Sequence, residues 1–299
     1  TYKWDNGNIY TGKFKGGKMS GKGTYTFATG ETYTGKFAND TYEGKGTLKF
    51  SDGSVYTGGF SDGKLSGKGS YKDKNGDSYS GDYFNNVKEG NGVYTFADGN
   101  KYSGQWKNDE YNGNGTLTYK TGEVYKGEFV ANEFNGKGTY TMLKGESYSG
   151  DFKNGKYNGK GVYIYSGGDK YEGDYVDNKM NGKGVYTLAD GGKYTGEFSN
   201  GMYNGKGELI QSSGDKYTGD FVDNDYHGQG EYIFKTGHKY TGQFKKGEFD
   251  GKGVMIYSSG DKYEGDFKNS KRNGIGTYYY SDGTIQKGKW VNDTYSGDK

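Results

Sequence analysis

The stretch Tyr102–Val124, YSGQWKNDEYNGNGTLTYKTGEV, contains the pattern that decides the fold. It begins with a Tyr-x-Gly-x-aromatic segment, which we call the box, continues through a Gly-x-Gly pair and ends just after the Thr121-Gly122 turn. The next box begins at Tyr125, so the stretch is one unit of a repeat. Self-similarity at a fixed, short period is the signature of a repeat architecture.

The unit recurs every 23 residues without any insertion. We call each set of equivalent positions a column and name it after one of its members. The Tyr10 column opens the boxes, and its members are Tyr10, Tyr33, Tyr56, Tyr79, Tyr102, Tyr125, Tyr148, Tyr171, Tyr194, Tyr217, Tyr240, Tyr263 and, at the thirteenth position, Gln286. Glycine follows two residues after each member, and an aromatic residue two residues later, in all thirteen copies. Random low complexity does not produce such columns.

Each unit contains two segments with the alternation of a β-strand. In Tyr10–Phe14 the residues Tyr, Gly and Phe alternate with polar residues, and Gly21–Phe27 places Gly23, Tyr25 and Phe27 on one face in the same way. A period of two with Thr, Tyr and Phe is typical of half-buried strands, and no segment has helical periodicity.

Two connections join these strands. At the Gly30 position, Asp-Gly and Asn-Gly pairs predict a hairpin turn, because these residues tolerate a positive φ. A loop with an odd number of residues keeps the aromatic residues of both strands on one face, so we expect a three-residue loop that pairs Tyr25 with Tyr33. We expect the connection Lys15–Ser20 to be a longer loop whose apolar residue folds back as an anchor: Met19, Tyr42, Leu65, Tyr111, Phe134, Tyr157, Met180, Tyr203, Tyr226, Phe249 and Tyr295.

These elements predict an all-β fold. We expect an elongated, single-layer antiparallel β-meander of about 13 tandem 23-residue hairpin repeats, forming a twisted or curved rod. Each aromatic ring is expected to lie flat over a glycine of a neighbouring strand, which buries the ring without a second layer. One continuous array over residues 1–299 is the expected domain organisation. Because the chain starts and stops inside a repeat, we also expect it to be a segment of a longer protein.

Composition excludes several classes of function. Only 29% of residues are hydrophobic while 18% are aromatic, which suits a thin sheet better than a thick aliphatic core. The 40 basic and 38 acidic residues give a net charge of +2, so nucleic acid is not an expected partner. Cysteine is absent, which excludes disulfides and thiolate metal sites. No apolar run reaches the length of a membrane span, and no signal peptide is visible.

At this point the residues resemble a known family. The box, the Asn-Gly, the GxGxYxF segment and the Asp-Gly turn are similar to the MORN (membrane occupation and recognition nexus) repeat, as in YSGDFKNGKYNGKGVYIY at Tyr148–Tyr165. The resemblance covers essentially the whole chain and implies a curved antiparallel sheet with a role in scaffolding, protein contact or attachment near membranes. Many members carry a basic residue and a histidine before Gly-x-Gly. Here only Lys271-Arg272-Asn273 keeps a basic pair, which weakens the implied binding of phosphoinositides.

No residues predict catalysis or a cofactor. His227 and His238 are interpreted as surface residues, and the Asp73–Asp77 segment, which has some features of a calcium loop, is interpreted as a turn. Acidic residues precede the box aromatic (Asp82, Glu128, Asp151, Asp174, Glu197, Asp220 and Asp266), and lysines stand inside Gly-x-Gly (Lys22, Lys45, Lys68, Lys137, Lys160, Lys183, Lys206 and Lys252). We interpret both columns as cross-strand charge pairs on the face opposite to the aromatic rings.

The sequence favours a non-enzymatic scaffold that binds another protein or a second copy of itself, with dimerisation through terminal repeats as one form of the latter. The candidate partner-binding aromatics are Tyr111, Phe134, Tyr157, Tyr203, Tyr226 and Phe249. Two alternatives are a module that attaches to membrane phosphoinositides and a bacterial or phage surface fibre that binds glycans. The resemblance implies the cytoplasm or the cytoplasmic face of a membrane, and the fibre alternative implies an extracellular surface.

Overall fold

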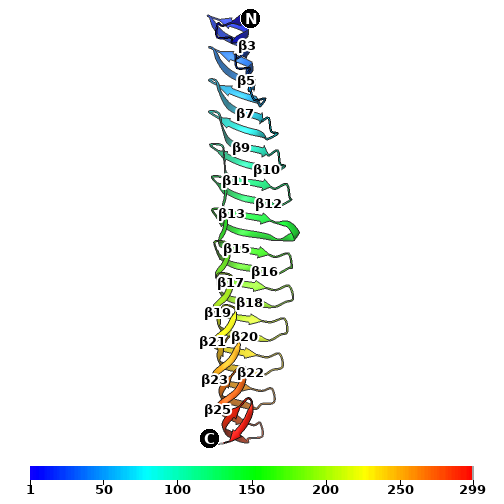
Figure 1. Ribbon diagram of the computed structural model, residues 1–299, viewed down its shortest axis with the longest axis vertical. Coiled ribbons are helices and arrows are strands. Elements are labelled where there is room, and N and C mark those ends of the chain that lie inside the picture. The colour runs from blue at the N-terminus through cyan, green and yellow to red at the C-terminus, as the bar shows by residue number, and fades with distance from the viewer. Residues whose placement is uncertain (298–299) are drawn as a thin grey trace. The chain divides into compact units, whose positions relative to one another are not determined.

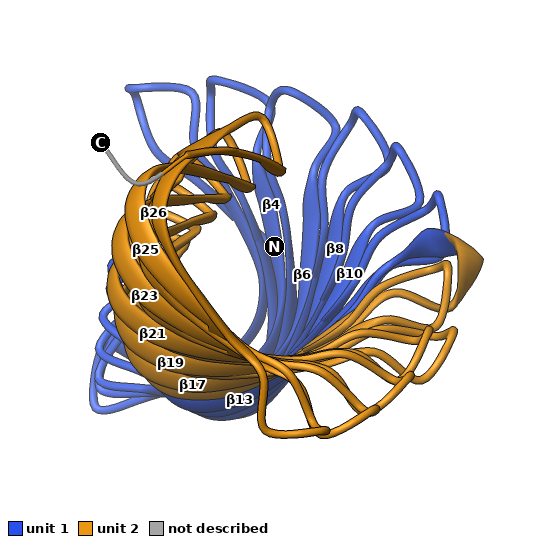
Figure 2. Ribbon diagram, turned by 90° about the horizontal axis from the view of Figure 1, so that it is seen from below, with its two compact units in different colours: residues 1–143, 152–155 blue, residues 144–151, 156–299 orange. Residues whose placement is uncertain are grey.

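The computed structural model describes residues 1–297, which form β-strands joined by short turns and one 3-10 turn, η1 (Leu143–Gly145) (Figure 1). The chain divides into two compact units (Figure 2). Unit 1 contains residues 1–143 and 152–155, and unit 2 contains residues 144–151 and the chain from Lys156 onward. The all-β prediction is confirmed.

Unit 1 contains β1 (Tyr2–Lys3), β2 (Ile9–Lys15), β3 (Lys18–Thr26), β4 (Thr32–Ala38), β5 (Thr41–Lys49), β6 (Val55–Ser61), β7 (Lys64–Lys72), β8 (Ser78–Phe84), β9 (Val87–Thr95), β10 (Lys101–Lys107), β11 (Glu110–Thr118), β12 (Val124–Val130) and β13 (Glu133–Thr141). Every one of these strands pairs with the next in antiparallel orientation. Its loops fan out in Figure 2, because successive strands are rotated relative to one another.

Strand β14 (Ser147–Lys153) contributes residues to both units. Unit 2 continues with β15 (Lys156–Ile164), β16 (Lys170–Val176), β17 (Lys179–Thr187), β18 (Lys193–Ser199), β19 (Met202–Ile210), β20 (Lys216–Val222), β21 (Asp225–Ile233), β22 (Lys239–Lys245), β23 (Glu248–Ile256), β24 (Lys262–Lys268), β25 (Lys271–Tyr279), β26 (Ile285–Val291) and β27 (Thr294–Gly297). Consecutive strands from β15 to β27 are again antiparallel neighbours. The expected meander is therefore confirmed in each unit. The single continuous array over residues 1–299 stays a prediction.

The turn between units of the repeat has the expected three-residue loop. Phe27 N donates to Glu31 O over 2.9 Å, and Gly30 N donates to Phe27 O over 3.0 Å. Gly30 has a φ of +97°, and Tyr25 lies opposite Tyr33 in the ladder. A side chain at the Gly30 position would be strained in this left-handed conformation, which explains the glycine in every copy.

The other connection differs from the prediction. Instead of a long loop over Lys15–Ser20, it is a two-residue turn at Gly16-Gly17, with φ of +59° and +77°. Two consecutive positive φ values define a type I′ turn, whose twist matches that of the flanking strands. The expected loop anchors of the Met19 column are therefore strand residues, and their assignment as loop anchors was wrong.

The missing length is taken up by a bulge in the second strand. Gly12 lies opposite Gly23, while the next residue, Lys13, lies opposite Ser20. The two intervening residues of β3 have no partner in β2, although both pair with β4, and the first of them, Gly21, has a φ of +73°. Side chains alternate between the two faces of a strand, so a bulge of two extra residues leaves this alternation unchanged. The Met19 column therefore stays on the aromatic face.

The core of each unit is a row of tyrosine rings seated on glycines. Tyr10 is fully buried, and a Cβ atom on Gly12 or on Gly23 would overlap with its ring. The predicted seating of rings on glycines is thus confirmed, with one seat on the tyrosine's own strand and one on its neighbour. Tyr10 Oη donates to Lys13 O over 3.1 Å at the bulge, and the same bond occurs in all twelve copies that have the tyrosine.

Box aromatics link successive tyrosines within a unit. The Tyr33 ring meets the Phe37 ring of its own box edge-on at 5.1 Å and the Phe60 ring of the next box at 4.9 Å. Edge-to-face pairs at these distances are favourable beyond the area that they bury. Burial also raises the pKa of Tyr33 to about 12, so the hydroxyl keeps its proton and continues to donate at neutral pH.

Candidate interaction surface

The six predicted partner-binding aromatics form a second layer over the buried tyrosines. The Tyr111 ring stacks on the Tyr102 ring with a centroid distance of 3.7 Å and an interplanar angle of 14°. The other five stack on their own box tyrosines at 3.7 to 4.0 Å: Phe134, Tyr157, Tyr203, Tyr226 and Phe249. Five of the six are half-buried and Phe249 is buried. Their role in binding a partner stays a prediction.

Two further columns lie on the same face. The Tyr25 column contains Tyr25, Leu48, Tyr71, Tyr94, Leu117, Tyr140, Tyr163, Tyr186, Leu209, Tyr232, Met255 and Tyr278, and the Phe27 column contains Phe27, Phe50, Asp73, Phe96, Tyr119, Met142, Tyr165, Leu188, Gln211, Phe234, Tyr257 and Tyr280. Nearly all of these side chains are half-buried. We call the Met19, Tyr25 and Phe27 columns of each unit its aromatic strip. A strip of this kind offers flat, partly wet rings to a ligand.

Carboxylates border the aromatic strip, a feature that the sequence reasoning missed. Tyr94 Oη donates to Asp77 Oδ2 over 2.7 Å, and Tyr163 Oη donates to Glu146 Oε2 over 3.1 Å. Equivalent bonds join Tyr186 to Asp169 and Tyr278 to Asp261. The hydroxyl of Tyr94 helps to hold the pKa of Asp77 below its usual value. An acidic residue 17 positions before a tyrosine of the Tyr25 column is the signal that could have revealed this border.

Two repeats replace the ring of the Met19 column by a cation. In unit 1, Lys88 Nζ lies 5.6, 5.6 and 5.4 Å from the ring centroids of Tyr79, Tyr94 and Trp106. Its ammonium also lies 3.3 Å from Asp109 Oδ1.

Arg272 occupies the same position in unit 2. Its guanidinium carbon lies 5.7, 5.3 and 4.5 Å from the ring centroids of Tyr263, Tyr278 and Trp290. Its Nε lies 3.2 Å from Asp293 Oδ1. Of the basic pair Lys271-Arg272, the arginine is therefore engaged within the chain.

A hollow opens in the aromatic strip of unit 2. It has a volume of about 370 Å³ and is lined by Tyr157, Tyr163, Tyr165, Tyr175, Asn178, Lys179, Met180 and Gly201. Tyr175 is 3% exposed, and its Oη has no hydrogen-bond partner among the described residues. Burial raises the pKa of Tyr175, so this hydroxyl is neutral. We call this hollow the tyrosine pocket.

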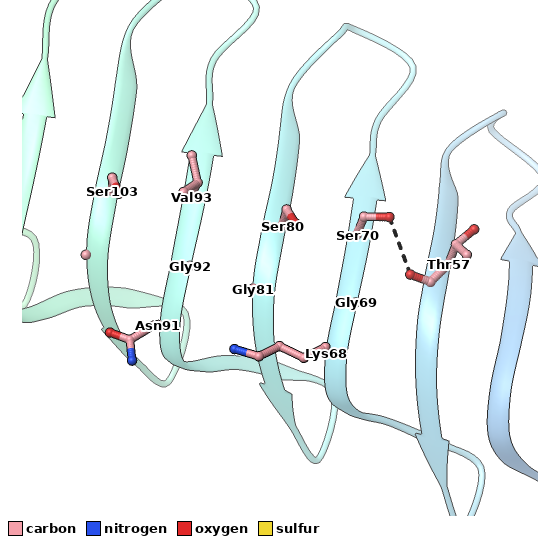
Figure 3. Close-up of a pocket in the computed structure, with 11 residues that line it drawn as sticks. Thr57, Lys68, Gly69, Ser70, Ser80, Gly81, Asn91, Gly92, Val93 and Ser103 are labelled. Atoms are coloured by element: carbon pink, nitrogen blue, oxygen red, sulfur yellow. Dashed lines mark hydrogen bonds between the residues drawn. The ribbon is translucent and has the colours of Figure 1, made fainter.

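A second hollow lies on the polar face of unit 1 (Figure 3). It measures about 590 Å³, and small side chains such as Ser70, Ser80 and Ser103 line it together with Lys68. Ser70 Oγ donates to Thr57 O over 3.4 Å, the bond drawn in Figure 3. The hollow gathers no group with a distinct chemistry.

The predicted cross-strand charge pairs are confirmed in four repeats. Lys68 Nζ lies 2.7 Å from Asp82 Oδ1, and the corresponding pairs are Lys160–Asp174, Lys206–Asp220 and Lys252–Asp266. The acidic residues that precede the box aromatic also form a hydrogen bond that was not predicted from the sequence. Asp82 Oδ2 accepts a hydrogen bond from Asn91 N over 3.1 Å, which satisfies an amide of the bulge.

The residues considered for metal binding are explained by turn chemistry. Asp73 Oδ1 accepts hydrogen bonds from Asn75 N and Asp77 N over 2.9 and 2.8 Å. His238 Nδ1 accepts one from Ser258 N over 3.0 Å, and His227 lies opposite Asp220 in the ladder. Among residues 1–297, no three His, Cys, Asp or Glu side chains gather in a way that could hold a metal ion. Nor does that part of the chain form a helix long and apolar enough to cross a membrane.

A family comparison matches twelve consecutive repeats. The MORN repeat model matches residues 10–32, 33–55, 56–78, 79–101, 102–124, 125–145, 148–170, 171–193, 194–216, 217–239, 240–262 and 263–285. The boundaries coincide with the predicted boxes from Tyr10 to Tyr263, while Gln286 lies beyond the matched residues. This match indicates a repeat array and no family of enzymes. None of the curated proteins matches the chain in sequence.

Solved structures show only distant likeness. The TCP domain of SAS-4 of Drosophila melanogaster, in complex with a proline-rich motif of Ana2, is 11% identical with a TM-score of 0.33, over 52% of this chain and 85% of that chain. The TCP10 domain of Danio rerio CPAP is 11% identical with a TM-score of 0.25, over 82% and 99%. Virginiamycin B lyase from Staphylococcus aureus is 8% identical with a TM-score of 0.15, over 89% and 82%. Likeness at these scores supports no conclusion about function.

Proposed function

We propose, from the premise that the chain belongs to the MORN-repeat family, that it is a non-enzymatic scaffold whose aromatic strip binds an extended segment of another protein. One observation carries the proposal: rings of the Met19 column stack on buried tyrosines and keep part of their own surface exposed. Rings held in this way lose little conformational freedom when a partner binds. Tyrosine is also enriched at protein interfaces, since its ring is apolar and its hydroxyl is polar.

The form of the strip favours an extended partner over a compact one. Within a unit the same three columns recur at each repeat, so a segment that lies along the strip meets similar rings at each step. The opposite face presents threonines, serines and paired charges, as in the Lys206–Asp220 ion pair, and offers few rings. Exposed ion pairs of that kind contribute little to binding.

Site-specific photocrosslinking tests the proposal. A photoreactive phenylalanine analogue would replace Tyr111, Tyr203 or Tyr226 on the strip, in cells of the source organism, and mass spectrometry would identify the crosslinked proteins. The matched control replaces Thr218, an exposed residue on the opposite face of the strand that carries Tyr217. We expect the same partner to be captured from all three strip positions and not from Thr218. Equal capture from both faces, or capture from neither, would contradict the proposal.

Vesicle sedimentation separates this function from membrane attachment. We expect no greater pelleting with phosphoinositide vesicles than with neutral vesicles, because Arg272 is held by Trp290 and Asp293. Pelleting that requires phosphoinositide and is lost at high salt would favour the membrane module instead. A partner that proves to be a second copy of this chain would keep the scaffold function and identify self-association, including dimerisation through terminal repeats.

A further inference from the structure

The tyrosine pocket exists because one repeat lacks the second-layer ring. Met180 occupies the Met19 column at this repeat, whereas the repeats before and after it carry Tyr157 and Tyr203 in that column. Met180 lies opposite Tyr175 in the ladder, and both line the pocket. A slender thioether side chain in place of a ring leaves open a hollow whose volume, about 370 Å³, lies at the lower end of the range of ligand sites.

The pocket contains a buried polar group that has no hydrogen-bond partner among the described residues. Most repeats carry phenylalanine as the aromatic residue of the box, as at Phe152 and Phe198, but this repeat carries Tyr175. Its hydroxyl is buried and lacks a hydrogen-bond partner within residues 1–297. A buried hydroxyl without a partner is unfavourable, so a ligand that supplies one would gain from filling the site.

The chain itself shows what such a group of rings accepts. Lys88 lies among Tyr79, Tyr94 and Trp106, and Arg272 lies among the three equivalent rings of its own repeat. In the tyrosine pocket, Tyr163 and Tyr175 occupy the columns of Tyr94 and Trp106. The cation's own position, however, is filled by Tyr157, which stacks on Tyr148 at 3.8 Å. A cation that contacts this group of rings must therefore belong to a ligand, and it must lie on the outer side of the Tyr157 ring.

The surrounding charge is negative on one side. Tyr163 donates a hydrogen bond to Glu146 over 3.1 Å. Burial is the largest cause that raises the pKa of Tyr165, and the negative charge of Asp169 is the second. Lys179 is the one cation in the lining of the pocket, and it is exposed. Two carboxylates beside π-rich walls favour a cationic ligand, and Lys179 opposes it.

We propose that the tyrosine pocket receives an arginine side chain of the extended partner segment. The guanidinium packs against the rings of Tyr157 and Tyr163, whose planes are inclined at 59° with centroids 6.1 Å apart, and donates an N–H to the buried oxygen of Tyr175. Arginine suits the site better than lysine because its planar group stacks on rings and donates several hydrogen bonds in fixed directions. This inference rests on the proposed function, since it assigns the chemistry of one anchor of that partner.

The test needs no knowledge of the partner. The probe is the peptide acetyl-Gly-Gly-Arg-Gly-Gly-amide, titrated into the whole chain carrying tyrosines labelled with carbon-13 in the ring. The comparison peptides carry Gln, Lys or Phe in place of Arg. We expect saturable shifts of the ring signals of Tyr157, Tyr163, Tyr165 and Tyr175, largest with the Arg peptide and absent with the Gln peptide. Single Tyr→Phe variants assign these signals.

Three variants make the test specific. Met180→Tyr restores the ring that neighbouring repeats carry, so the array should fold and the shifts should vanish. Tyr175→Phe keeps the ring and should weaken binding about tenfold, the effect of losing a hydrogen bond to a charged group. Lys179→Gln removes the opposing charge and should strengthen binding. Tyr83→Phe is the matched control, because it makes the same change in the repeat where Lys88 is already in place.

Equal shifts with the Arg and Gln peptides, stronger shifts with the Phe peptide, or unchanged binding by Met180→Tyr would overturn the proposal. The absence of any shift with the Arg peptide would overturn it as well. None of these results would bear on the photocrosslinking result, so the scaffold function and the arginine anchor fail separately.

Discussion

The guanidinium carbon of Arg272 lies 4.5 Å from the centroid of the Trp290 ring, and Lys88 Nζ lies 5.4 Å from that of Trp106. In both repeats the cation replaces a ring, the next box carries tryptophan, and the next turn carries an aspartate that pairs with the cation. Tryptophan is the ring that attracts a cation most strongly. Three substitutions thus occur together, twice, which indicates that they form one interacting set.

Removing this cation should destabilise its repeat. Arg272→Met keeps the length of the side chain but loses the attraction to Trp290 and the ion pair with Asp293, whose Oδ1 keeps only the hydrogen bond from the backbone N–H of residue 272. We expect a loss of about 1–2 kcal/mol in the free energy of unfolding, measured by urea denaturation. The control is Lys271→Met, an exposed neighbour whose substitution should be nearly neutral. Similar losses in both variants would show that the rings do not hold the arginine.

The glycine seats should not tolerate a methyl group. In Gly207→Ala the new Cβ would overlap with the ring of Tyr194, so either the ring or the strand must move. We expect a loss of about 1–3 kcal/mol or more, typical of overpacking in a tight core. Gly167→Ala is the matched control, because a Cβ there meets no atom within 4 Å and its φ is not in the left-handed region. Calorimetry on both variants gives the comparison.

Stability should fall at alkaline pH. Burial raises the pKa of Tyr33, Tyr56 and Tyr263 from 10.0 to about 12. Because the folded chain binds the phenolic protons more tightly than the unfolded chain, this contribution is complete below about pH 10 and is lost as pH rises towards about 12.

Urea midpoints measured across that range, together with the ultraviolet absorbance of phenolate, check this expectation. If every tyrosine ionised near its ordinary pKa while the urea midpoint stayed constant, the buried row of rings would be wrong.

One turn should be easy to stabilise. Lys246 has a φ of +51° at the first position of its type I′ turn, where most repeats carry asparagine or aspartate. A left-handed conformation is unfavourable for lysine, so Lys246→Asn should stabilise unit 2 by about 0.5–1 kcal/mol. Lys245→Asn makes the same chemical change in the adjoining strand, where asparagine is disfavoured, and should destabilise slightly. Thermal unfolding of the pair distinguishes a turn effect from a charge effect.

Most of the fold could be predicted because the aromatic columns and the Gly30 column each leave a local pattern. The alternation of apolar and polar residues in Tyr10–Phe14 predicted the strands. Because Tyr25 and Tyr33 must lie on the same face, the number of residues in the loop between the strands had to be odd. The connection after Lys15 was missed since its length was divided between a tight turn and a bulge. Only the positive φ at Gly16, Gly17 and Gly21 separates these two elements, and a row of glycines does not reveal which of them turns the chain.

The candidate surface was predictable in composition but not in geometry. Tyr203 and its column stood out as apolar residues outside the expected strands. That they stack on the Tyr10 column depends on the bulge, which returns them to the aromatic face. The tyrosine pocket could not be predicted from the column that Met180 occupies, because a methionine alone does not show whether its neighbours close over it.

The glycine seats have a consequence for how such a chain can change in length. Each box tyrosine rests on glycines of its own hairpin, as Tyr10 rests on Gly12 and Gly23. A duplicated or deleted repeat therefore brings or removes its own seat, and the junction it creates has the same ring contacts as every other junction. Gene rearrangements in whole multiples of the repeat should leave the sheet intact, whereas the insertion or deletion of a single residue between a box tyrosine and its glycines would move that repeat's own ring off its seat.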